Sequence, residues 1–204
     1  MQALQSDAQV EPVAIPATTT SLGVWGKMGG VFIPVDMEMV VQDGLGTMNI
    51  LTLGRLVSRD WQLMRADLPA GLEPPLHLVS VKVNLLPRLV GIHSTILLDN
   101  FHAMVGPDGV EQVLEDFEGE IRWITMPVSL VTLDSILSTT DDAYQGKRAG
   151  VYSFGEASDR DSGGIYKSPT GGPLPVVASS SFMTESDTNI GETFVIEVNN
   201  RLIP

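Results

Sequence analysis

The residues of this chain that could carry chemistry are concentrated in "ILLDNFHAMVGPDGVEQVLEDFEG", residues 96–119. An apolar run there contains Asp99, and a second acidic cluster with Asp116 and Glu118 follows a Pro-Asp-Gly turn. Two carboxylates could act as general acid and general base, and a group of carboxylates could hold a structural calcium ion. The chemistry depends on which of these side chains meet, and that depends on the elements that carry them.

We favour a purely architectural interpretation of these carboxylates. Asp99 and Asn100 would end a strand, while Glu115, Asp116 and Glu118 would form a solvated sheet edge that discourages pairing with other chains. A general acid would also need an apolar or like-charged setting that raises its pKa, and the sequence alone does not show which carboxylates meet. We therefore predict no catalytic, cofactor-binding or metal-binding residue and leave the ligand-binding residues open. A structural calcium ion is the one cofactor that stays as an alternative.

The other polar motifs also lack the spacing of catalytic or metal sites. His77, His93 and His102 show no HExxH pattern, and His77, between two leucines on a predicted strand, is expected to face solvent. The serines of "ASSS" at 178–181 have no GxSxG elbow, and "DRDSGG" at 159–164 lacks the spacing of a calcium-binding EF-hand loop. No glycine cluster forms a phosphate cradle, so any ATPase would be a separate polypeptide. We expect the chain not to be an enzyme.

The aromatic residues allow two interpretations, a platform that stacks on sugar rings or a set of core anchors. The candidates are Trp25, Trp61, Trp123, Tyr144, Tyr152 and Tyr166. Because Trp25 and Trp61 lie inside apolar runs with strand periodicity, we expect both in the core. Trp123, between Arg122 and Ile124, is left without an assignment.

Composition sets broad limits on the partners. The chain has 204 residues, of which 43% are hydrophobic, so it can bury a core. Its formal net charge of -13 disfavours nucleic acid and anionic membrane surfaces as partners. It has no cysteine, no apolar run of the roughly 18 residues that a membrane helix needs, and no signal peptide features at its start. We expect a soluble chain that is a piece of a larger protein.

Runs with a period of two residues, bounded by Gly, Pro, Asp or Asn, predict antiparallel strands. The six clearest cover 21–28, 34–43, 47–54, 61–68, 77–85 and 94–104. They predict a mainly β fold, a jelly-roll β-sandwich. The expected core residues are Val24, Met37, Met39, Leu51, Leu63, Val81, Val83, Ile96, Leu98 and Phe101.

The remaining segments are assigned around this sandwich. We expect a loose arm, or a strand that lacks its neighbour, over 1–19. The sandwich with an extended loop at its end is expected over 20–170, and the start of a small α+β unit over 171–204. Residues 127–142, with Leu130, Leu133, Ile136 and Leu137 on one helical face, predict a short helix or irregular crossing. The polar stretch 155–175 is expected to be an exposed linker. The segment "KRAGVYSF" at 147–154 is expected to pair with the sandwich, either within one chain or exchanged between two in a dimer.

Two sets of motifs resemble those of a known family. The tail "LPVVASSSFMTESDTNIGETFVIEVNNRLIP" is similar to the segment in which FtsX-like ABC-transporter permeases place an apolar strand, a Ser before a large apolar residue, and a Gly-Asp turn. Here Gly191-Glu192 takes the place of Gly-Asp. The stretches "TSLGVWGKM", "DWQLMRADLP", "ILLDNFHAM" and "LEDFEG" resemble strands of carbohydrate-binding-module-like sandwiches.

The resemblance implies the extracytoplasmic region of a bacterial permease with a jelly-roll insertion. Membrane helices and a separate ATPase subunit would be its partners, and its role would be to bind, or to couple to, an external substrate or partner. The alternative is an accessory carbohydrate-binding module of a secreted polysaccharide-acting protein.

Overall fold

A computed structural model describes residues 13–85, 93–119, 123–125, 136–154, 162–167, 196–198 and 201–203. Within these residues the regular structure consists of strands and turns, without a helix. The strands are β1 (Val13–Ile15), β2 (Thr19–Met28), β3 (Val35–Gln42), β4 (Met48–Leu56), β5 (Gln62–Asp67), β6 (Leu76–Leu85), β7 (Ser94–Val105), β8 (Val110–Glu115), β9 (Ile124–Thr125), β10 (Ile136–Thr140), β11 (Ala149–Phe154), β12 (Ser162–Tyr166), β13 (Ile196–Val198) and β14 (Arg201–Ile203). The prediction of a mainly β fold is confirmed.

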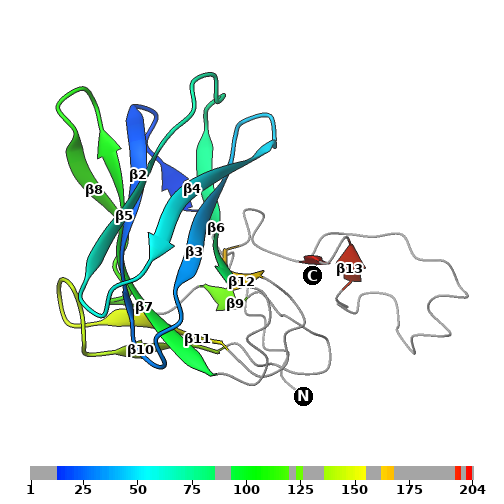
Figure 1. The fold of residues 1–204 in the computed structure, drawn as a ribbon. Coiled ribbons are helices and arrows are strands. Elements are labelled where there is room, and N and C mark those ends of the chain that lie inside the picture. Colours follow the sequence, from blue (N-terminus) through cyan, green and yellow to red (C-terminus); the bar gives the residue numbers. More distant parts are fainter. Residues whose placement is uncertain are drawn as a thin grey trace, which may run out of the picture.

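Most of these strands form two antiparallel sheets that face each other as layers (Figure 1). Sheet A has the order β4-β3-β6-β12-β9, with β1 also paired to β6. Sheet B has the order β10-β11-β7-β2-β5, with β8 also paired to β7. The short strands β13 and β14 pair only with each other. Strands β1 to β12 therefore form a two-sheet sandwich.

The long strands β6 and β7 organise the two sheets in the same way. One edge of β6 pairs with β3, while its other edge pairs with β1 and then with β12. One edge of β7 pairs with β2, while its other edge pairs with β11 and then with β8. Both central strands are thus covered on both edges by other strands of the same chain.

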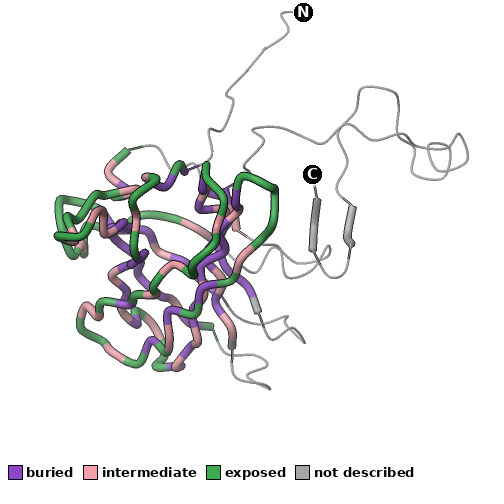
Figure 2. Tube along the Cα trace, turned by 90° about the horizontal axis from the view of Figure 1, so that it is seen from above, coloured by how far each residue is buried: buried purple, intermediate pink, exposed green. Residues whose placement is uncertain are grey.

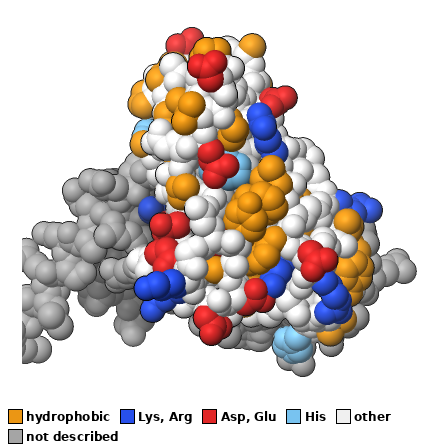
Figure 3. Space-filling model, turned by 90° about the vertical axis from the view of Figure 1, so that its left-hand side faces the viewer, with side chains coloured by type: hydrophobic (Ala, Val, Ile, Leu, Met, Phe, Trp, Pro, Cys, Tyr) orange, Lys and Arg blue, Asp and Glu red, His pale blue; other side chains and the backbone are white. Residues whose placement is uncertain are grey.

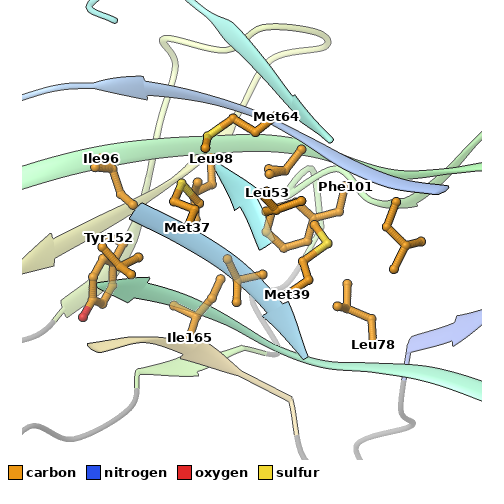
Figure 4. Close-up of a cluster of buried hydrophobic side chains, with 14 of the residues drawn as sticks. Met37, Met39, Leu53, Met64, Leu78, Ile96, Leu98, Phe101, Tyr152 and Ile165 are labelled. Carbon is orange, nitrogen blue, oxygen red and sulfur yellow. The ribbon is translucent and has the colours of Figure 1, made fainter. Parts of the chain in front are cut away.

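The core lies between the two sheets, where alternate side chains of facing strands meet (Figure 4). Met37 and Met39 of β3 reach from sheet A toward Leu98 and Phe101 of β7. Figure 2 shows buried stretches running through the inside of this body and exposed residues gathered in its turns. Burial of these apolar side chains is the main force that holds the two sheets together.

The predicted core residues are buried with one exception, Leu63. Its side chain is 43% exposed, while the next residue, Met64, is buried. The apolar run of β5 allowed either register, and pairing with β2 turned Met64 and Ala66 inward. A shift of one residue exchanges the two faces of a strand, which is why the prediction for Leu63 was wrong.

The six predicted strands are all present, as β2 to β7, within two residues of the expected ends at most positions. The expected pairing of "KRAGVYSF" is also confirmed, because Gly150 of β11 lies opposite Leu98 of β7. Both strands belong to the same chain.

Two expectations about the remaining segments were wrong, and a third is refined. Within 1–19, Val13–Ile15 is a strand that has a neighbour, since it pairs with Leu76–Leu78 of β6. Ile136–Thr140 is a strand paired to β11 instead of a helix, since pairing in a sheet outweighed a weak helical pattern. Ser162–Tyr166, placed in an exposed linker, is a strand between β6 and β9 in which Ile165 is buried. The boundary expected near residue 170 lies outside the described residues.

Candidate functional site

Asp99 lies in the middle of β7 and not at the end of a strand. Because Leu98 points into the core, Asp99 points to the outer face of sheet B, where it is fully buried. Its Oδ1 accepts a hydrogen bond from the backbone N–H of Asn100 at 2.7 Å. Its Oδ2 accepts two more, from the backbone N–H groups of Tyr144 at 2.8 Å and Gln145 at 3.0 Å. The prediction that Asp99 and Asn100 end a strand was therefore wrong.

Tyr144 and Gln145 belong to the 141–148 loop, which joins β10 to β11. Glu118 is a second carboxylate that binds this loop. Oε1 of Glu118 accepts hydrogen bonds from the backbone N–H groups of Lys147 and Arg148, the latter at 2.8 Å. Asp99 binds the middle of this loop and Glu118 binds its end. The two carboxylates together fix the loop against sheet B by four backbone N–H groups.

The electrostatic settings of these two carboxylates differ. Burial raises the pKa of Asp99 above its ordinary value, three backbone hydrogen bonds oppose that rise, and the negative charge of Glu118 adds to it. The hydrogen bonds from Lys147 and Arg148 hold the pKa of Glu118 below its ordinary value. Each carboxylate is thus engaged by loop backbone, as an anchor would be.

The rest of the acidic cluster is engaged in its own turn. Asp116 accepts a hydrogen bond from the backbone N–H of Glu118 at 3.0 Å, and Glu115 accepts one from the N–H of Phe117 at 3.1 Å. Oε2 of Glu115 also accepts a hydrogen bond from Nε1 of Trp123 at 3.0 Å. In the described part of the chain, no group of three or more His, Asp or Glu side chains could hold a metal ion.

The 141–148 loop places an aromatic ring on the outer face of sheet B. The ring of Tyr144 stacks on that of Trp25 with centroids 3.8 Å apart and planes 13° apart. The rings of Trp61 and Tyr144 make an edge-type contact, with centroids 6.1 Å apart and planes at 64°. We call Trp25, Trp61 and Tyr144 the aromatic cluster. Figure 3, which views the side of the molecule formed by sheet B, shows hydrophobic side chains gathered over the middle of this face with acidic and basic side chains around them.

The expectation that Trp25 and Trp61 are core residues was wrong, because both are half-exposed and outside the core. The sequence did contain a signal for Trp25. Leu22 and Val24 in the same strand are buried, so a period of two places Trp25 on the outer face with Gly23 and Lys27. Trp61 precedes β5 and carries no comparable signal.

Charged groups border the aromatic cluster. Nζ of Lys27 lies 5.1 Å from the centroid of the Trp61 ring and also forms an ion pair with Oδ2 of Asp142. A cation over an indole face is favourable, and Asp142 belongs to the same loop as Tyr144. The cluster therefore combines aromatic faces with one donor and one acceptor at its border.

The other aromatic candidates do not join this cluster. Trp123 is buried and meets the ring of Phe101 edge to face at 5.5 Å. Tyr152 is buried in the core, where its hydroxyl accepts a hydrogen bond from the N–H of Gly164 at 2.8 Å and so links the two sheets. Tyr166 lies in sheet A, and burial raises its pKa. A single platform of all six residues is thus excluded.

The three histidines lie in different environments. His102 is buried over Gly23, where a Cβ atom would meet its Nε2, and its Nδ1 lies 2.9 Å from the carbonyl oxygen of Asn100. His77 is half-buried on β6, so the expectation of a solvent-facing residue holds only in part, and His93 is exposed before β7. The serines at 178–181 lie outside the described residues, while Ser162, Gly163 and Gly164 of "DRDSGG" belong to β12.

No helix in the described part of the chain is long and apolar enough to span a membrane. Comparison with known proteins finds no family model, no curated protein and no solved structure that matches this chain.

Proposed function

We propose that this chain is a non-enzymatic domain that binds or couples to an external partner through the outer face of sheet B. The observation that carries this proposal is the aromatic cluster, which lies outside the core and whose Tyr144 belongs to a loop held by two carboxylates. Large aromatic side chains normally contribute most when they are buried. Their exposure on a fixed scaffold is a feature of binding surfaces.

The engagement of the carboxylates supports binding over catalysis. Both oxygens of Asp99 accept hydrogen bonds from backbone N–H groups, and Glu118 accepts two more. A general acid or base has to exchange its proton with a substrate, whereas these groups are occupied by the loop that they hold.

The wider context that we propose is the extracytoplasmic region of a bacterial FtsX-like ABC-transporter permease. The support is the tail motif of 174–204, together with the antiparallel pairing of Ile196–Val198 and Arg201–Ile203 near its end. In this context a stiff sandwich would pass motion of membrane helices, driven by a separate ATPase subunit, to the bound partner. An accessory carbohydrate-binding module of a secreted protein is the alternative that the exposed aromatic residues also favour.

The reading frame on either side of this chain tests the context. Membrane helices in the same frame are expected. A catalytic domain for polysaccharide cleavage in their place would favour the accessory module and contradict the permease.

A turnover screen on glycosides, esters and peptides tests the absence of catalysis. We expect no turnover by the purified chain. Activity that is lost on Asp99→Asn or Asp116→Asn would overturn the proposal, since it would give these carboxylates a chemical role.

A further inference from the structure

The aromatic cluster has a composition that selects a class of ligand. We propose that it is a stacking site for a neutral pyranose ring, with Tyr144 as the platform and with Lys27 and Asp142 as partners for the sugar hydroxyls. This inference deepens the proposed function and rests on it, because it names the ligand of the same face of sheet B.

The arrangement of the rings shows which face a ligand would use. Tyr144 lies parallel to Trp25 at 3.8 Å, so it covers the facing side of the indole. Tyr144 is 41% exposed, so the face of its ring that is turned away from Trp25 can serve as the platform. Trp61, at 64° to Tyr144 with ring centroids 6.1 Å apart, is the other aromatic neighbour of the platform. One ring-sized platform matches a single flat ring better than an extended apolar segment.

The polar border fits a sugar in particular. A pyranose presents C–H groups on its face and hydroxyls on its rim, and hydroxyls both donate and accept hydrogen bonds. Lys27 supplies only donors and Asp142 only acceptors, and the two lie together in an ion pair. The Asp142 side chain is 55% exposed, so its oxygens can be reached from solvent.

Charge argues for a neutral ligand. The formal net charge of the chain is -13, and Lys27, the cation that lies over the Trp61 ring, is already paired with Asp142. A phosphorylated or otherwise polyanionic ligand would meet repulsion from the whole molecule, and Lys27 is not free to offset it. A neutral saccharide does not incur this cost.

The loop anchors prepare the site before a ligand arrives. The N–H of Tyr144 itself is bound by Asp99, so the backbone beneath the platform is fixed by a buried group. A ring that is already ordered loses little conformational freedom on binding, which favours affinity from a small contact area.

Calorimetric titration of the 204-residue chain with four neutral hexasaccharides tests the proposal. The probes are β-1,4-linked glucose, β-1,4-linked N-acetylglucosamine, β-1,4-linked mannose and α-1,4-linked glucose. We expect at least one to bind, with Tyr144→Ala weakening the affinity about tenfold. Tyr144→Phe keeps the ring and should stay within about threefold of the parent chain.

Leu45→Ala is the matched control, because Leu45 is 78% exposed in the turn between β3 and β4 of sheet A. It should leave the titration unchanged, and thermal unfolding should show that every variant is folded. Failure of all four saccharides to bind at millimolar concentration would overturn the ligand class. Binding that Tyr144→Ala leaves intact would overturn the site.

A fifth titration, with a neutral proline-rich peptide, separates this inference from the proposed function. Peptide binding that Tyr144→Ala abolishes, with no saccharide bound, would overturn the sugar while leaving the outer face of sheet B as the binding surface. Saccharide binding combined with a catalytic domain in the reading frame would keep the site and overturn the permease context.

Discussion

At the scale of single residues, the two carboxylates that hold the 141–148 loop respond to pH in opposite directions. Glu118 has a folded-state pKa below its ordinary value of 4.5, so its stabilising contribution is complete above about that pH and is lost as the pH falls through the folded value. Asp99 has a folded-state pKa above 3.8. Between the ordinary pKa of Asp99 and its higher folded-state pKa, the folded state binds more protons than the unfolded state. The contribution of Asp99 to stability therefore rises as the pH falls through this window.

The first prediction concerns Glu118→Gln. The amide keeps the shape but removes the charge that the loop N–H groups bind, so the variant should be less stable than the parent chain at pH 7. The difference should shrink as the pH falls below 4.5 and through the folded pKa of Glu118, where the parent loses its charge too. Urea unfolding of both chains from pH 3 to pH 7 measures it. A difference that is constant over this range would contradict the role of the charge.

The second prediction compares two leucines with different exposure. Leu98 is fully buried between the sheets, and Leu98→Ala should lower the free energy of unfolding by about 2 to 5 kcal/mol. Leu63 is 43% exposed on the outer face, and Leu63→Ala should cost less than about 1 kcal/mol. Equilibrium denaturation decides both. Equal losses at the two positions would show that the register of β5 differs from the one described.

At the scale of elements, strands with a clear period of two could be predicted from the sequence, whereas a short glycine-rich strand could not. β3 alternates Val35, Met37 and Met39 with acidic residues, and this pattern leaves one assignment of faces. β12 reads "SGGIY", too short and too rich in glycine to show a period, and its place comes from tertiary pairing with β6.

The candidate site was partly predictable for the same reason. Trp25 follows the alternation of β2, but Tyr144 lies in a loop, and its stacking on Trp25 depends on anchors contributed by Asp99 and Glu118. Those anchors are separated from the loop residues that they bind by 29 to 46 positions. A spacing of that kind leaves no local pattern in the sequence, so the site emerges only once the sheets are formed.

The third prediction tests the placement of β12 through Gly164. This residue has a φ of +140°, and a Cβ atom there would overlap the carbonyl oxygen of Val81 in β6. Gly164→Ala should therefore cost about 3 kcal/mol or more, since both the backbone strain and the overlap have to be relieved. Gly54 has a φ of +101° with open space around it, so Gly54→Ala should cost only about 1 to 2 kcal/mol. Thermal and urea unfolding compare the two, and a smaller loss at Gly164 would contradict the pairing of β12 with β6.

At the scale of the whole molecule, the topology places the exposed edges on the outermost strands. β6 in sheet A and β7 in sheet B are paired on both edges. Within the described sheets, the ends of the path are β4, β9, β5 and β10. Two of these strands carry charged side chains, Arg55 of β4, which pairs with Asp36 of β3, and Arg65 of β5. Such charges make edge-to-edge addition of another chain less favourable.

The last prediction follows from the pairing of β11 with β7 inside one chain. The sequence left open whether this strand stays with its own sandwich or is exchanged between two chains, and exchange would give a dimer. Because the Gly150–Leu98 and Tyr152–Ile96 pairs are formed within one chain, we expect a monomer in which the amides of 150–154 exchange slowly. Size-exclusion chromatography with light scattering gives the mass, and amide hydrogen exchange gives the protection. Fast exchange over 150–154 in a monomer would show that β11 is not part of the sheet, and a dimer would contradict the expected monomer.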